Sequence, residues 1–73
     1  MPAPHQARDP RTDPKAGDCL MVNGRNRRVT SIVPVAGHYD VHYYSPERQR
    51  YGKCWYSTWQ EWARNAEVIH SAE

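Results

Sequence analysis

Short runs of apolar and β-branched residues follow one another along the chain, and residues that favour turns separate them. Residues 19–22 have the length of a strand, and Asn23-Gly24 directly after them is the strongest short signal for a hairpin. Residues 27–35 are rich in Val, Ile and Thr and predict a second strand. Pro34 has no backbone N–H, so we expect the end of this strand to be an edge or a bulge. Ala36-Gly37 then turns the chain.

The next two strands are predicted by alternation and by a second turn signal. Residues 38–44 alternate in character, and a strand there places Tyr39, Val41 and Tyr43 on one face, which we expect to be the core face. His38, Asp40, His42 and Tyr44 would then share the other face.

A proline-containing turn separates this strand from the fourth. Residues 45–48 have Pro at the second position of the turn, and residues 50–56 follow as a strand. Gly52 inside this strand predicts a bulge. Trp55 and Tyr56 are consecutive, so one of them should face the core and the other solvent.

A short helix and a last strand complete the pattern. Ser57 and Gln60 match a capping box, which predicts that the helix opens at Ser57. Residues 67–70 predict the closing strand. The helix carries one apolar stripe with core spacing, formed by Trp59, Trp62, Ala63 and Ala66.

The chain divides into a folded unit and two ends. Residues 1–16 contain four of the six prolines and no large apolar residue, so we expect a disordered N-terminal tail, either simply solvated or an arm that grips a partner. Residues 17–70 form the predicted domain, and residues 71–73 should fray.

The predicted order is four meandering strands, a helical turn and a fifth strand, which resembles the SH3-like barrel, including its KOW and Tudor-like versions. The resemblance rests on Gly17-Asp18, on a Gly-Arg turn leading into Val29-x-x-Ile32, and on the helical turn before residues 68–69. The chain is also similar to short uncharacterised phage and bacterial proteins. The resemblance implies a mainly β fold: a five-stranded SH3-like barrel with one short helix before the last strand.

Composition explains how so short a chain builds a core. The chain has 73 residues, three Trp, five Tyr, no Phe and an apolar fraction of 38%, and every aromatic residue lies between Tyr39 and Trp62. Aromatic side chains bury the most area per residue, so this window must supply much of the core. The absence of a signal sequence and of a long apolar run leads us to expect a cytoplasmic protein that does not enter membranes.

Cationic residues suggest the candidate site. The net charge is only +2, but in a meander the first and third turns lie at the same end of the sheet, and six Lys or Arg residues belong to those turns. Such a cluster attracts phosphates, and neighbouring Tyr rings can stack on bases. The predicted nucleic-acid-binding residues are Arg25, Arg27, Arg28, Arg48, Arg50, Lys53, Tyr44 and Tyr51.

Other chemistry finds little support in the sequence. Cys19, Cys54, His38 and His42 lack the close pairing of zinc ligands, and on a strand His38 and His42 would stand about 13 Å apart. The two cysteines should be reduced thiols in the cytoplasm, although strands could bring them together as a disulfide. No catalytic or phosphate-loop motif is present, so we expect no enzyme activity, no metal, no cofactor and no small-molecule substrate.

Two functions therefore remain as hypotheses, beside a third possibility, that the protein is a part of a larger assembly and has no ligand of its own. The first is a non-enzymatic module that binds nucleic acid through the basic turns and adjacent aromatic residues. The alternative is a protein–protein interaction module, such as a phage or prophage protein that acts on a host protein. A basic face that carries Tyr or Trp favours the first, and a neutral aromatic patch favours the second.

Overall fold

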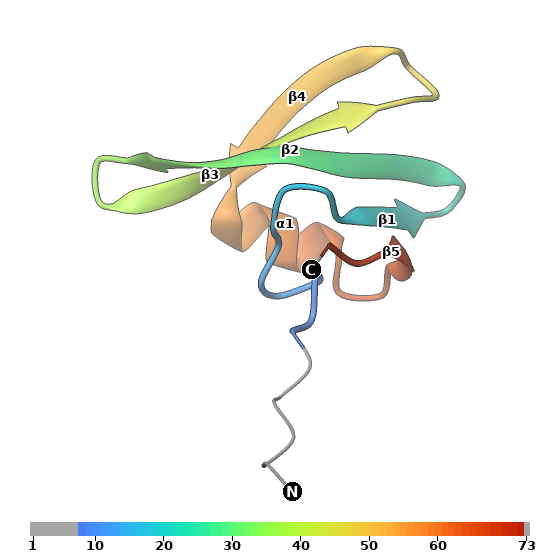
Figure 1. Cartoon of the computed structure of the whole chain (residues 1–73), viewed down its shortest axis with the longest axis horizontal. Coiled ribbons are helices and arrows are strands. Elements are labelled where there is room, and N and C mark those ends of the chain that lie inside the picture. The colour runs from blue at the N-terminus through green and yellow to red at the C-terminus, as the bar shows by residue number, and fades with distance from the viewer. Residues whose placement is uncertain (1–7, 73) are drawn as a thin grey trace, which may run out of the picture.

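The computed structural model describes residues 8–72 and confirms a mainly β architecture with one short helix before the last strand (Figure 1). Five antiparallel strands form one sheet, and the helix lies against it. The elements are β1 (Cys19–Val22), β2 (Arg25–Val35), β3 (His38–Ser45), β4 (Arg50–Trp55), α1 (Tyr56–Trp62) and β5 (Glu67–His70).

The sheet has the order β4-β3-β2-β1-β5 and is open. β4 and β5 are its two edges, so the strand pairing does not confirm the closed barrel that the sequence predicted. The long strand β2 pairs with β1 through residues 25–28 and with β3 through residues 28–35, with a register shift between Val29 and Ser31. Pro34 lies in the part of β2 that pairs with β3 but not with β1, so its missing N–H is tolerated at a free edge, as predicted.

Left-handed residues form the predicted hairpin turns. Asn23 and Gly24 have φ values of 52° and 80°, and Ala36 and Gly37 have φ values of 44° and 90°. Two successive residues with positive φ make the turn whose twist matches that of paired strands. The β3–β4 turn is different: the amide of Gln49 donates to the carbonyl of Pro46 at 3.3 Å.

The core lies between α1 and one face of the sheet, which we call the inner face. Its buried apolar residues are Leu20, Val29, Val41, Trp59, Ala63 and Ala66. Trp59 is the largest of them and is fully buried, and Trp62 is half-buried, so the residues of the predicted stripe do pack on the core. The helix ends at Trp62, however, so Ala63 and Ala66 are buried from the segment after it. The ring of Tyr43 approaches Trp59 with centroids 6.2 Å apart, which joins the sheet to the helix.

The start of the helix differs from the prediction. α1 begins at Tyr56, the N-cap residue is Trp55, and no side chain caps the helix, so the expected capping box at Ser57 does not form. Trp55 has an extended backbone because it still belongs to β4. The strand runs directly into the helix, and this leaves no residue free to serve as a polar cap.

The face assignment of β3 holds at its centre and fails at its start. Val41 is buried and Tyr43 packs on the core, but Tyr39 is 52% exposed and Asp40 only 8% exposed. The β2–β3 hairpin extends beyond α1 (Figure 1), and the aromatic ring that approaches Tyr39 is that of Tyr56, with centroids 6.0 Å apart. The burial of a β3 side chain therefore depends on whether α1 covers it as well as on the face of the strand from which it projects.

Residues 8–16 pack on the domain, in contrast to the disordered tail expected over residues 1–16. Pro10 and Pro14 are buried, and the Trp59 indole Nε1 donates to the carbonyl of Pro10 at 3.0 Å. Arg11 donates to the carbonyl of Ala66 at 2.9 Å. Pro10 and Pro14, two of the four prolines that suggested disorder, are thus part of the packed domain. The part of the expected tail before residue 8 lies outside the described residues.

A buried carboxylate joins both ends of this unit. Asp18 is fully buried and accepts two hydrogen bonds from the Arg8 guanidinium, at 2.6 and 2.9 Å. The backbone amides of Lys15 and Ala72 donate to it at 2.8 and 2.6 Å. Burial opposes ionisation of Asp18, but these bonds outweigh it and lower its pKa. The expected fraying over residues 71–73 therefore does not extend to Ala72.

Within residues 8–72, no helix has both the length and the apolar character needed to cross a bilayer.

Candidate nucleic-acid interface

The first and third turns meet at one end of the sheet, as the meander predicts. Glu47 in the third turn accepts hydrogen bonds from the backbone amide of Asn26, at 3.0 and 2.9 Å, and from its side-chain amide. Asn26 follows the first turn. The bond from the Asn26 backbone amide lowers the pKa of Glu47, so this carboxylate is ionised and already occupied at neutral pH.

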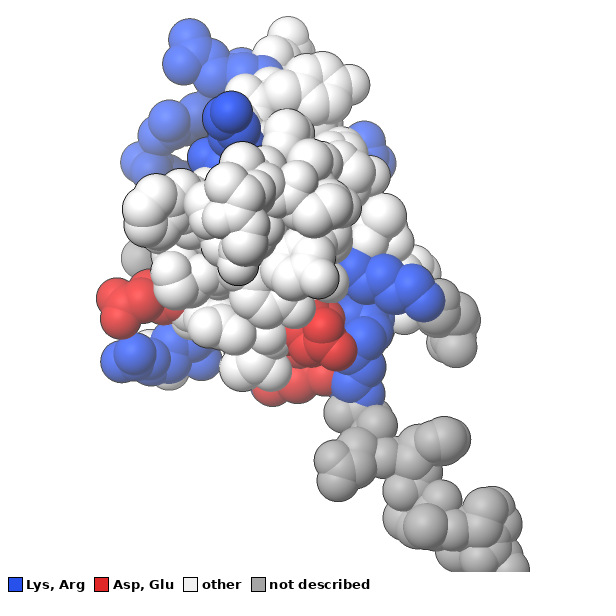
Figure 2. Space-filling model, turned by 90° about the vertical axis from the view of Figure 1, so that its left-hand side faces the viewer, with Lys and Arg blue, Asp and Glu red and all other residues white. Residues whose placement is uncertain are grey.

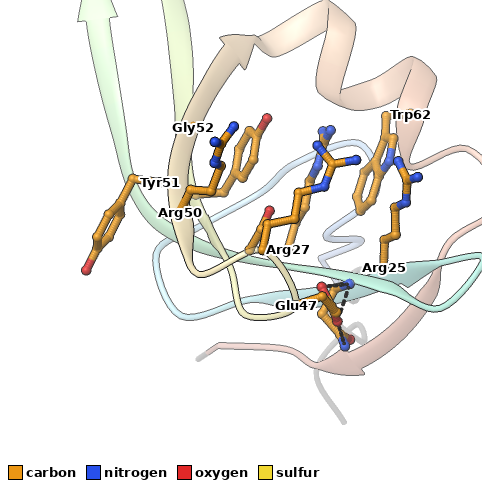
Figure 3. A pocket seen from close by; sticks show the side chains of 11 residues that line it. Arg25, Arg27, Glu47, Arg50, Tyr51, Gly52 and Trp62 are labelled. Carbon is orange, nitrogen blue, oxygen red and sulfur yellow. Dashed lines mark hydrogen bonds between the residues drawn. The ribbon is translucent and has the colours of Figure 1, made fainter.

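A hollow lies between these turns and the end of α1, and we call it the arginine groove (Figure 3). Its volume is about 330 Å³, and it is bounded by strands β2, β3 and β4. Tyr43 and Trp62 form its apolar wall, and Glu47 is its one acidic residue. The cations that line it are Arg25, Arg27, Arg48 and Arg50.

Two aromatic rings hold Arg27 in place. Its guanidinium carbon lies 4.3 Å from the ring centroid of Tyr43 and 4.3 Å from that of Trp62. Arg27 belongs to β2, whose inner face meets the end of α1, so a cation is placed where an apolar residue would otherwise close the core. A guanidinium between two rings gains about 0.5–2 kcal/mol per contact. These contacts hold the N–H donors of Arg27 in one orientation at the wall of the groove.

Gly52 makes room for one of these rings and does not form the predicted bulge. It pairs directly with Tyr43 in a regular stretch of the β3–β4 ladder. A Cβ atom at residue 52 would lie 2.9 Å from the Tyr43 ring atoms Cε1, Cζ and Oη. The Tyr43 ring therefore crosses over the glycine, and the absent side chain is what lets it reach Arg27.

We expect Gly52→Ala to disturb this arrangement. The added methyl overlaps the Tyr43 ring, which must shift against Trp59 and Arg27, so the free energy of unfolding should fall by about 1–3 kcal/mol. Chemical denaturation measures this loss. Lys53→Ala, at the next and exposed residue of β4, is the matched control and should change stability by less than about 0.5 kcal/mol. Equal stabilities for the two variants would contradict the assigned role of Gly52.

The other four predicted site residues lie on the opposite face of the sheet. Side chains alternate along a strand, so Arg28 points away from Arg27, and Tyr44 points away from Tyr43. Tyr51 borders the arginine groove through its position in β4, but its ring is directed away from the arginines (Figure 3). The eight predicted residues therefore form two surfaces instead of one.

We call this second surface the outer face; it carries Arg28 and the outward side chains of β3 and β4. Tyr44 and Tyr51 are cross-strand partners whose ring centroids lie 4.8 Å apart, and the Arg28 guanidinium lies 5.7 Å from the Tyr44 ring. Trp55 is 61% exposed at the other end of β4 and contacts His38, with centroids 5.3 Å apart. The sequence predicted that one of Trp55 and Tyr56 would face solvent, and Trp55 is that residue.

Charge is unevenly distributed over the surface. In the view of Figure 2, a group of Lys and Arg side chains gathers on one upper flank, while the acidic side chains visible on this face lie lower. Three carboxylates pair with cations of the N-terminal segment and the helix end: Asp9 with Arg11, Asp18 with Arg8, and Glu61 with Arg64. Among residues 8–72, none of the ion pairs involves an arginine of the first or third turn.

The cysteines contribute no reactive group to either surface. Cys19 and Cys54 are free thiols on β1 and β4, which β2 and β3 separate. Burial raises the pKa of both thiols, so both are protonated at neutral pH. Among residues 8–72, no three His, Cys, Asp or Glu side chains are placed to share a metal ion.

No protein-family model, curated protein or solved structure matches this chain.

Proposed function

We propose that the protein is a non-enzymatic nucleic-acid-binding module and that its fold is an open version of the SH3-like barrel. The order β4-β3-β2-β1-β5, with a helical turn before the last strand, supports the fold proposal. The observation that carries the function is the arginine groove. It combines four arginines with a single carboxylate, Glu47, whose oxygens already accept hydrogen bonds from Asn26.

Phosphate is the ligand that this groove suits best. Arginine offers planar, bidentate donors to phosphate oxygens, and Arg27 presents its guanidinium already oriented by Tyr43 and Trp62. Arg25, Arg48 and Arg50 are exposed and add charge along the rim. A polyanion with regularly spaced phosphates can contact several of them at once and release the counterions that it carries.

The groove hypothesis is tested with Arg25→Ala, Arg48→Ala and Arg50→Ala combined in one protein. Arg27 is kept because its packing contributes to the fold. We expect binding to labelled oligonucleotides at low salt, measured by fluorescence anisotropy, to weaken at least tenfold in this triple variant. We also expect the slope of log K against log salt to become shallower by about 0.7 for each phosphate of a single strand that the variant no longer neutralises.

The control uses one arginine inside the groove and one outside it. Arg50→Ala and Arg64→Ala remove the same charge from exposed residues, and only Arg50 lines the groove. Arg50→Ala should weaken binding more than Arg64→Ala, and both should unfold at the same temperature as the parent. Equal losses would show that only net charge matters. If the parent binds no oligonucleotide at low salt, the proposed function is wrong and a protein-interaction module replaces it.

A further inference from the structure

The edge strand β4 carries side chains to both surfaces. Arg50 points into the arginine groove, while Tyr51, Lys53 and Trp55 point to the outer face at alternate positions. Among residues 8–72, β4 pairs only with β3, so its other edge separates the two surfaces by the width of one strand. A single ligand that passes this edge can contact both.

The outer face is open and lacks an exposed acid where β3 and β4 cross it. Tyr51 is 76% exposed and Trp55 is 61% exposed, which is unusual for rings in a domain with so small a core. Lys53 lies between them and is exposed. Asp40 is the one acidic residue of β3 and β4; it is 8% exposed, and its Oδ1 lies 3.8 Å from Nε2 of His38.

We propose that the outer face binds the bases of single-stranded nucleic acid, with the phosphates of the same strand entering the arginine groove. This inference rests on the proposed function and adds the ligand class. Bases stack on the exposed rings of Tyr51 and Trp55, and Lys53 contacts the phosphate between them. The tilted ring of Tyr44 packs beside that of Tyr51, and the Arg28 guanidinium lies over the Tyr44 ring.

The spacing of the rings fits a short single strand. Tyr51 and Trp55 are four residues apart on β4, a distance of about 13 Å. Stacked nucleotides rise about 3.4 Å each, so about four stacked nucleotides, or fewer unstacked ones, span the two rings. In a duplex both faces of an internal base are already covered by its neighbours. Tyr51 and Trp55 can therefore stack on the bases of a single strand and not on those inside a duplex.

Charge selects nucleic acid over an apolar partner for this surface. The aromatic residues alternate with Lys53, His42 and Arg28, and neither Lys53 nor Arg28 has a carboxylate partner among the ion pairs of residues 8–72. An apolar protein surface would have to desolvate these two cations without compensation. A single strand offers bases to the rings and phosphates to the cations, so it satisfies both kinds of side chain.

The test compares single-stranded and duplex ligands with outer-face variants. The probes are fluorescein-labelled oligothymidylate and oligouridylate of about 12 nucleotides, and a duplex of equal length. We expect Tyr51→Ala and Trp55→Ala each to weaken single-strand binding about tenfold, while affinity for the duplex stays within about twofold. Tyr51→Phe should bind single strands like the parent because it keeps the ring.

Tyr39→Ala is the matched control, since Tyr39 is 52% exposed but belongs to the inner side of the β2–β3 hairpin. It should bind both probes like the parent. If Tyr51→Ala and Trp55→Ala leave single-strand affinity unchanged while the groove triple variant loses it, the outer-face inference is wrong and the proposed function stands. If the parent binds neither single strands nor duplex, the outer-face inference and the proposed function are both wrong. Equal parental affinity for the two ligands also overturns the single-strand assignment.

Discussion

Replacing Trp59 with alanine should remove about 3–5 kcal/mol from the free energy of unfolding, the largest stability effect that we expect from one substitution. Trp59 is fully buried and contacts the rings of Tyr43 and Trp62, with centroid distances of 6.2 and 5.1 Å. Its indole N–H also donates to the carbonyl of Pro10. The substitution would therefore remove contacts that join the helix to both the sheet and the N-terminal segment. A chain of 73 residues has a total stability of about 4–11 kcal/mol, so this loss is about a quarter of the total or more.

Circular dichroism during thermal and urea unfolding measures this effect. Trp59→Phe keeps a ring and loses the bond to Pro10, so it should fold with a smaller loss, about 1–3 kcal/mol. Trp55→Ala is the matched control: it removes a Trp that is 61% exposed and should cost less than about 1 kcal/mol. If Trp59→Ala unfolds at the same urea concentration as Trp55→Ala, the assignment of the core is wrong.

Replacing Asp18 with alanine is the second large effect, with an expected loss of about 3 kcal/mol. The substitution leaves the Arg8 guanidinium and two backbone amides, of Lys15 and Ala72, without the acceptor that they share. The Arg8 side chain is 22% exposed and keeps partial access to solvent. The expected loss is therefore near the lower end of the roughly 3–5 kcal/mol that breaking a buried ion pair costs. Amide hydrogen exchange should become faster at Lys15 and Ala72, whose amides bind Asp18 in the parent.

The pH dependence of stability gives an independent test of Asp18. Its pKa is lowered in the folded protein, so the folded state favours the ionised form, and the contribution is fully present above the ordinary Asp value of about 3.9. It is lost as the pH falls below that value and through the lowered folded pKa. Asp18→Asn should therefore lose less stability than the parent between about pH 5 and pH 2. Parallel curves for the two proteins would show that Asp18 does not carry this dependence.

Local patterns were sufficient to predict the strands and the burial of Trp59, Ala63 and Ala66. β1 and β5 were predicted with their observed bounds, and the turn residues Asn23-Gly24 and Ala36-Gly37 adopt the positive φ values that such turns need. These features depend on neighbours in sequence. The closed barrel depended instead on resemblance, and the sheet is open between β4 and β5.

The packing of residues 8–16 was not predictable from local composition. A proline-rich segment has few backbone donors and no large apolar side chain, which normally indicates disorder. Its hydrogen-bond partners all lie outside the segment: Trp59 and Ala66 are distant in sequence, and Asp18 follows it closely. The sequence held one signal, since Asp18 is a lone acid next to an apolar strand and needs a cationic partner if it is buried.

The candidate site was predicted in part. The meander placed the cations of the first and third turns at one end, and the Glu47–Asn26 bonds show those turns in contact. The division into two surfaces follows from the register in which Tyr44 pairs with Tyr51, together with the face that α1 covers. Turn signals in the sequence determine neither this register nor the face of the sheet on which the helix packs. From the sequence, Trp62 was assigned to the core alone. Its contact with Arg27 joins the helix to the sheet, and local sequence patterns do not predict such a contact.

The most direct test of the proposed binding mode is a two-dimensional 15N–1H NMR titration of the parent protein with oligothymidylate at low salt. We predict shifts in the backbone amides of Tyr51 and Lys53, in the indole N–H of Trp55, and in the guanidinium signals of the arginine groove. The indole N–H of Trp59 should stay in place, because it is bound to Pro10 inside the core. Shifts confined to residues 8–16 and α1, or no shifts at all, would contradict this binding mode.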